Sequence, residues 1–320
     1  MFPIGGYFEW EFPAKQYLPL HADAIRLNGA RYALEYILQG VVNVKTVWIP
    51  YFTCEVVLEP LKRLGIEYRF YHIDDSLELA SSIILNDGEY LLYTNYYGIK
   101  DSYISHLVRE YGDKLIVDNA QALYCEPVAE HQFYSPRKFV GMPDGGLAIT
   151  SVTDKFMELP VDQSFDRCSH LLKRIDLGAS GGFVDFQKND GLLSEENLSR
   201  MSLLSSKIFD SVDFESVRKI RRKNFERVHE KLRVSNRLQI PSMESFACPL
   251  VYPYWTDRDN LKKKLIDNKI FVATYWPNVF EWCESTDLEY ELAKHVVCIP
   301  IDQRYSVDEM DFIINEVNNV

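Results

Sequence analysis

A carboxylate and an amine, twenty residues apart, are the side chains of this sequence whose types and spacing suggest chemistry. The apolar run at 115–117 ends in Asp118, and a carboxylate at the end of a buried strand is costly unless it meets a cation. Ser135 and Lys138 follow on a turn, and the pair Gly145-Gly146 comes after them. Pyridoxal phosphate (PLP) needs such groups: an acid for its ring nitrogen, an amine for its aldehyde, and hydroxyl or N–H groups for its phosphate. The pattern therefore suggests a PLP site.

The segments Asp118-Asn119-Ala120-Gln121, Ser135-x-x-Lys138 and Gly145-Gly146 resemble the cofactor core of the DegT/DnrJ/EryC1/StrS aminotransferases. The resemblance implies a fold-type I PLP enzyme with an aspartate aminotransferase-like α/β fold. It also implies a mainly parallel sheet of the seven-stranded type and a smaller α+β C-terminal domain. The implied activity is transfer of an amino group from glutamate to a nucleotide-linked keto-sugar in polysaccharide biosynthesis, by a homodimer.

The resemblance also implies a role for each of four residues. Lys138 is the catalytic amine, which holds the cofactor and then moves a proton as general base and acid. Asp118 pairs with the pyridine nitrogen, Gln121 lies beside the ring oxygen, and Ser135 hydrogen-bonds the phosphate. The family more often has its serine five residues before the lysine, where this chain has Phe133. We expect the Lys138 side chain to be buried.

A helix start near residue 29 is the second candidate for phosphate binding. Asn28-Gly29 precedes residues 30–38, whose apolar positions have helical spacing. The N–H groups at such a start point outward and can bind an anion, although an ordinary capped helix gives the same pattern. In the resembling family this position binds the phosphate through Gly-Thr or Gly-Ser. Here Ala30 lacks the hydroxyl, so Gly29, Ala30 and Arg31 are predicted to bind the phosphate through backbone N–H groups and the Arg31 guanidinium.

Departures from the family pattern leave other functions open. Cys54 stands where the family has an aromatic residue stacked on the cofactor ring. Tyr51, Phe52 or Tyr97 would replace it, or would simply pack at strand ends. One alternative is a PLP enzyme of another reaction type, a dehydratase or a lyase. The other is a fold-type I scaffold with a binding role and no catalysis, which the altered phosphate loop favours and the intact Lys138 disfavours.

Alternating strand and helix patterns are expected to position these residues. Strands are predicted at 46–50, 67–73, 89–93, 114–117 and 146–151, and helices at 54–64 and 101–111. This alternation indicates a mainly parallel sheet covered on both faces, with ligands at the carboxyl ends of its strands. Residues 51–53, 95–98 and Asp118 follow or end three of the strands, so three chain segments are predicted to meet at one edge.

The remaining sequence suggests an arm, a loop region and a small end domain. Residues 1–25 are predicted to form an arm or edge strand, 165–190 an irregular loop region, and 194–232 a long helical stretch. Beyond these, strands at 249–254, 270–276 and 295–301, a helix at 257–268 and a capping box at Ser306 and Glu309 indicate an α+β unit. We place a large PLP-binding domain at 1–230 and a small domain at 231–320.

Composition excludes several classes of protein. The net charge of −12 weighs against nucleic-acid partners, and no apolar run approaches the ~20 residues of a membrane span. The N-terminus lacks a basic start and a sustained apolar segment, so we do not expect a signal peptide. Six cysteines without C-x-x-C pairs argue against a zinc site and fit a reducing compartment, which predicts a cytoplasmic protein without a metal.

Overall fold

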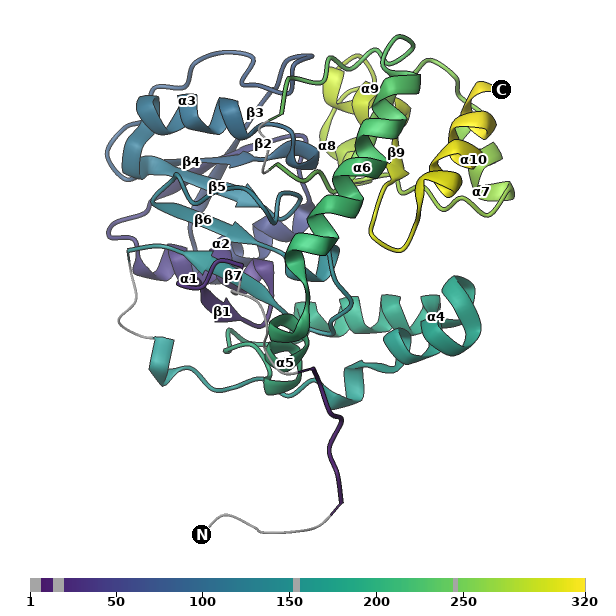
Figure 1. Cartoon of the computed structure of the whole chain (residues 1–320). Coiled ribbons are helices and arrows are strands. Elements are labelled where there is room, and N and C mark those ends of the chain that lie inside the picture. Colours follow the sequence, from purple (N-terminus) through teal and green to yellow (C-terminus); the bar gives the residue numbers. More distant parts are fainter. Residues whose placement is uncertain (1–6, 14–19, 152–155, 244–246, 320) are drawn as a thin grey trace.

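A computed structural model describes residues 7–13, 20–151, 156–243 and 247–319, and its centre is a seven-stranded sheet (Figure 1). The strand order is β1-β7-β6-β5-β4-β2-β3. Neighbours from β3 across to β6 pair in parallel, whereas β7 runs antiparallel to both β6 and β1. The strands are β1 (Ile25–Leu27), β2 (Thr46–Pro50), β3 (Glu67–Tyr71), β4 (Glu89–Thr94), β5 (Leu115–Asn119), β6 (His131–Tyr134) and β7 (Gly146–Ile149). The predicted mainly parallel sheet is confirmed, although β1 and β6 were not predicted as separate strands.

The sheet is covered on both faces because its central strands carry apolar side chains in both directions. On one face, Leu92, Ile116 and Phe133 belong to a core shared with the first two helices. On the other, Leu91 and Val117 belong to a core that continues into the C-terminal part of the chain. Successive side chains of a strand point to opposite faces, so a strand buried on both sides reads as an unbroken apolar run. This explains the apolar run that precedes Asp118.

The helices of the first half pack against this sheet. They are α1 (Ala30–Gly40), α2 (Leu58–Leu64) and α3 (Asp101–Tyr111). Helix α2 ends at Gly65, whose φ of 66° is readily adopted by glycine. The α3 bounds coincide with the predicted helix, and α1 and α2 lie within or close to theirs.

The prediction of an irregular loop at 165–190 is wrong. Most of that region belongs to helix α4 (Ser169–Glu195), which reverses at Gly178, where φ is 75°. The helical arm before Gly178 contacts the arm after it: Ser169 and Lys173 donate hydrogen bonds to the Asp185 carboxylate at 3.1 and 2.7 Å. Figure 1 shows α4 as a folded-back pair of helical arms that projects beside the body of the molecule. The sequence suggested a loop because its glycines and charges interrupt the helical pattern, and contacts between the two arms stabilise the helix instead.

The long helical stretch predicted at 194–232 is divided in two. Helix α5 (Leu203–Ser211) begins at Ser202, whose hydroxyl accepts from the Ser205 N–H, and α6 (Phe214–Leu232) begins at Asp213. The residues before α5 are extended, because Asn28 N–H bonds to the Ser199 carbonyl and Met201 N–H to the Arg26 carbonyl. Tertiary hydrogen bonds to β1 and its flanking residue therefore prevent a continuous helix.

The C-terminal part is an α+β unit around a two-stranded antiparallel sheet. Its elements are β8 (Val251–Trp255), α7 (Leu261–Asp267), α8 (Val279–Trp282), α9 (Leu288–His295), β9 (Val296–Pro300) and α10 (Val307–Asn318). The capping box of Ser306 and Glu309 is present at the start of α10. The strand predicted at 270–276 is wrong: only Ala273 bridges to Cys298, and Trp276 has a φ of 56°, which extended strands do not adopt. The domain boundary near residue 230 stays a prediction.

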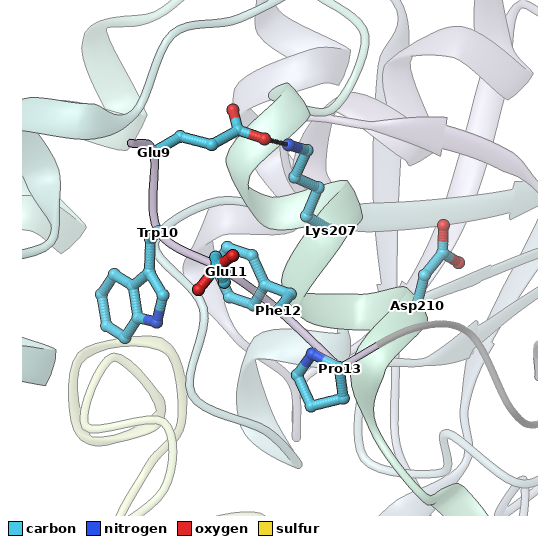
Figure 2. A pocket seen from close by; sticks show the side chains of 7 residues that line it. All are labelled: Glu9, Trp10, Glu11, Phe12, Pro13, Lys207 and Asp210. Atoms are coloured by element: carbon cyan, nitrogen blue, oxygen red, sulfur yellow. Dashed lines mark hydrogen bonds and ion pairs between the residues drawn. The ribbon is translucent and has the colours of Figure 1, made fainter. Parts of the chain in front are cut away.

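Residues 7–13 form an extended segment beside α5, and Figure 2 shows the side chains of residues 9–13. Glu9 forms an ion pair with Lys207 of α5, and the rings of Trp10 and Phe12 stack. An open hollow lies between this segment and α5, lined by Glu9, Trp10, Glu11, Phe12, Pro13, Lys207 and Asp210. The predicted arm is present in this part, whereas residues 1–6 and 14–19 lie outside the described residues. None of the helices in the described ranges is both long and apolar enough to cross a bilayer.

Candidate active site

Four chain segments meet at the carboxyl edge of the parallel strands, and side-chain hydrogen bonds join three of them. The Thr53 and Thr94 hydroxyls, 3.1 Å apart, connect residues 51–53 to the end of β4. The Gln121 side-chain oxygen accepts the Tyr97 N–H at 2.7 Å. The Asn95 amide donates to the Asn119 side-chain oxygen at 2.9 Å, one strand end to the next. The segment after β6, residues 135–138, leaves the same edge because β6 runs parallel to β5. The predicted convergence at one edge is therefore present.

Asp118 is the buried acid of this edge, with an exposed fraction of 5%. Its carboxylate accepts the Ala120 N–H at 2.8 Å. Burial raises the pKa of Asp118, and the positive charge of Lys138 together with the Ala120 N–H acts in the opposite direction. A carboxylate held in this way is costly while charged and is suited to a cationic partner.

Lys138 lies in the turn that follows β6, at the end of the short helix Pro136–Lys138. Its backbone N–H bonds to the Ser135 carbonyl at 3.1 Å. The expected burial of Lys138 is wrong for this chain, since the residue is exposed. The two groups proposed to hold opposite ends of one ring are thus a buried acid and an accessible amine at the same edge.

Gln121 provides a direct test of whether a ring fits between them. The residue is 2% exposed, and its oxygen is used by Tyr97, but its side-chain nitrogen is buried without a hydrogen-bond partner among the described residues. Buried polar atoms are nearly always paired, so such an atom calls for an acceptor from outside the chain. A ring oxygen of PLP is an acceptor of the required kind. The residues present therefore fit the cofactor.

The predicted phosphate end is built where β7 passes the start of α1. A Cβ on Gly146 would lie 2.2 Å from the backbone carbon and oxygen of Gly29 and 2.6 Å from the Ala30 nitrogen. Only glycine allows this approach, which places the Gly145-Gly146 pair against the helix start. The first intrahelical bond runs from the Ala33 N–H to the Gly29 carbonyl, and the N–H groups of the preceding turn have no partner within the helix.

The other predicted phosphate groups differ in their availability. Arg31 donates to both oxygens of Glu59 at 2.8 Å, so its guanidinium already has a carboxylate. Ser135 is buried, and its hydroxyl has no hydrogen-bond partner in the described part of the chain. The Ser135 hydroxyl is thus available to a ligand, whereas the Arg31 guanidinium is already paired with Glu59.

Two of the three aromatic residues suggested as replacements for the ring-stacking side chain lie in the protein core, and the third, Tyr51, is half-buried. Phe52 and Tyr97 are each 1% exposed and pack on Trp276, and Tyr51 stacks on Phe70. Cys54 instead lies near the charges of Lys138, Asp118 and Arg31, and burial raises the pKa of its thiol. A small neutral thiol therefore occupies this side of the site.

Arg137, the other cation of this turn, is a candidate for which the sequence predicted no contact with the cofactor. Its side chain is 15% exposed, its Nε atom is buried without a partner among the described residues, and the charge of Arg31 acts on it. Its position beside Lys138 was visible in the sequence, but a lysine or arginine next to a reactive residue is usually a surface cation. Burial alone distinguishes it, and burial required the tertiary structure.

Comparison with known proteins shows the fold. By sequence, no family model and no curated protein matches the chain. Solved structures match 92% of the chain, including a DegT DnrJ EryC1 StrS aminotransferase from Brucella abortus (15% identity, 85% of that chain, TM-score 0.59). Others are Spr1654 from Streptococcus pneumoniae in its PMP form (14%, 87%, 0.66) and DesI in the presence of its TDP-sugar product (15%, 80%, 0.65). The chain has the fold of the fold-type I aminotransferases, as the resemblance implied.

Proposed function

We propose that this chain is a PLP-dependent aminotransferase. The observation that carries the proposal is the arrangement at one sheet edge: buried Asp118, accessible Lys138, and a Gln121 side-chain nitrogen without a partner in the described chain. The same fold is shared with aminotransferases of known structure, which supports the reaction class. Fold alone does not determine function, so the proposal depends on the site.

Each residue has a defined task in the proposed reaction. When bound, PLP supplies an aldehyde that links to amines and a protonated ring that accepts electrons. Asp118 holds the proton on the ring nitrogen, and Gln121 donates to the ring oxygen. Lys138 Nζ would hold the cofactor at rest. Once displaced by the amino donor, it would take a proton from the substrate carbon and deliver it to the cofactor carbon that carried the aldehyde. Ser135, Gly29, Ala30 and Arg31 bind the phosphate.

The substrates follow from the neighbours and from the resemblance. One neighbouring structure contains a TDP-sugar product, which supports a nucleotide-linked keto-sugar as acceptor. We propose glutamate as amino donor and polysaccharide biosynthesis as the setting. All six cysteines are free, which supports a cytoplasmic protein, and the site residues are proposed to work in a homodimer.

The test is cofactor capture at Lys138, followed by a half-reaction. Protein incubated with PLP and reduced with borohydride should carry the cofactor on Lys138, as read by peptide mass spectrometry. Lys138→Ala should carry none, and Lys173→Ala, which removes another lysine, should be unchanged. Glutamate should convert the unreduced PLP protein to the pyridoxamine form, as followed by absorbance. A wild-type protein that captures no PLP would instead be a non-catalytic scaffold, and capture without conversion by any amino donor would indicate another PLP reaction.

A further inference from the structure

The Arg137 side chain is largely buried and has few hydrogen-bond partners among the described residues. Its side chain is 15% exposed, and its Nε atom has no hydrogen-bond partner among the described residues. Its one carboxylate contact is a long one, 3.5 Å from Nη1 to Asp190 of α4, and the Asp190 side chain is 54% exposed. A buried charge is costly unless it is paired and hydrogen-bonded. Within the described part of the chain, Arg137 therefore lacks a close anion.

A second guanidinium lies near it. Burial lowers the pKa of Arg137, and the charge of Arg31 lowers it further, while the charges of Asp190 and Asp144 act in the opposite direction. Arg31 is held by both oxygens of Glu59, so one carboxylate serves the pair closely. Because only one carboxylate lies close to these two guanidinium groups, the binding of another anion between them would be favourable.

The surroundings of this pair select the kind of anion. Arg31 belongs to the first turn of α1, whose N–H groups favour negative charge. Arg137 follows Ser135 by two residues in the turn that ends at Lys138, and the Ser135 hydroxyl has no partner in the described chain. Arginine forks, a hydroxyl and a helix start together make the donor set of a phosphate site.

We infer that Arg137 binds the cofactor phosphate and supplies the contact that is missing where Ala30 replaces a hydroxyl residue. The inference rests on the proposed function, because the phosphate is that of PLP. It adds a residue for which the resemblance gave no role. The competing explanation is structural: Arg137 would only tie α4 to the body of the molecule through Asp190.

The experiment compares PLP with pyridoxal, which has the aldehyde and the ring but no phosphate. Dissociation constants for both are measured by absorbance titration on the full chain. For Arg137→Gln we expect PLP to bind about 10- to 100-fold more weakly, as for the loss of hydrogen bonds to a charged group. Pyridoxal binding should be unchanged, which also shows that the variant is folded. Arg137→Lys should fall between the two proteins, because lysine keeps the charge but not the planar fork.

Two further variants separate the explanations. Asp190→Asn should keep the full preference for PLP over pyridoxal, and the surface variant Arg218→Gln on α6 should behave as wild type. The inference is overturned if Arg137→Gln weakens both ligands equally, or if Asp190→Asn loses the preference to the same extent. In either case PLP would still bind to the wild-type protein, and the proposed function would stand. If wild type binds neither ligand, both the inference and the proposed function fail.

Discussion

At the scale of single residues, the site combines groups whose environments conflict with their charges. Asp118 is an acid in a buried position, and Arg137 is a cation without a close anion. Both are costly in the protein alone and useful once a ligand of the opposite charge is bound. This conflict is what separates them from the ion pairs on the surface of the chain, such as that of Arg218 and Glu215 on α6.

The first prediction concerns Asp118. Because burial raises its folded-state pKa above the ordinary value of 3.8, Asp118 favours folding only while it is protonated. That contribution is present below the unfolded pKa and is lost as the pH rises through the folded pKa, so at pH 7 the charged carboxylate destabilises the cofactor-free protein. Asp118→Asn should therefore raise the free energy of unfolding at pH 7 by on the order of 1 kcal/mol.

Urea unfolding at several pH values measures this effect. The gain should shrink as the pH is lowered towards the pKa, and the variant should no longer bind PLP. Asp166→Asn, at an exposed position, is the control and should leave stability unchanged. A variant that is less stable than wild type at pH 7 would show that the carboxylate is stabilised in the cofactor-free protein, against this prediction.

At the scale of elements, the site depends on how closely β7 approaches the start of α1. Leu27 pairs with Gly146, and the Gly145 N–H bonds to the Asn28 carbonyl at 3.1 Å. The strand therefore holds the helix start against the sheet edge, where the phosphate is proposed to bind. This contact has room only for a residue without a side chain.

The second prediction is that Gly146→Ala destabilises the protein and weakens PLP binding. The new Cβ would lie 2.2 Å from Gly29 backbone atoms, and backbone cannot move aside as a flexible side chain can. Overpacking of this kind costs about 1–3 kcal/mol. Gly191→Ala is the matched control, because nothing lies within 4 Å of its Cβ position in α4. Urea unfolding and PLP titration report both effects, and equal stability of the two variants would contradict the role given to Gly146.

At the scale of the whole molecule, α4 exposes an apolar surface that the rest of the described chain leaves uncovered. Its exposed apolar side chains are Leu172, Ile175, Leu177, Phe183, Val184, Phe186 and Leu192. A group of apolar side chains of this size on one projecting element commonly marks a protein interface. The buried face of α4, with Asn189 bonded to the Pro143 carbonyl at 2.9 Å, packs on the segment after Lys138. A second copy bound to α4 would thus lie next to the site.

The third prediction is that this surface forms the proposed homodimer. Ile175 and Val184 are 77% and 74% exposed, so replacing both with glutamate removes no core contact. We expect wild type to be a dimer and Ile175→Glu/Val184→Glu to be a folded monomer, as measured by light scattering and circular dichroism. Its melting temperature should be lower than that of wild type, because association with a second copy stabilises the folded state. Val234→Glu, at a residue 92% exposed elsewhere, should remain a dimer. A monomeric wild type, or a dimeric double variant, would place the interface elsewhere or remove it.

Much of the sheet and its edge could be predicted from the sequence, because they follow from local patterns. The apolar run before Asp118, the alternation of strands and helices, and the spacing from Asp118 to Lys138 and the glycine pair are all properties of neighbouring residues. They were sufficient to predict the parallel sheet and the meeting of separate segments at one edge.

Which side chains are buried there was decided only by the tertiary structure. Lys138 is exposed and the Arg137 side chain is largely buried although they are adjacent and both basic. Residues 165–190 are mostly helical although their sequence is interrupted by glycines. Burial and helix stability at these positions depend on contacts with residues distant along the chain, and no local pattern records such contacts.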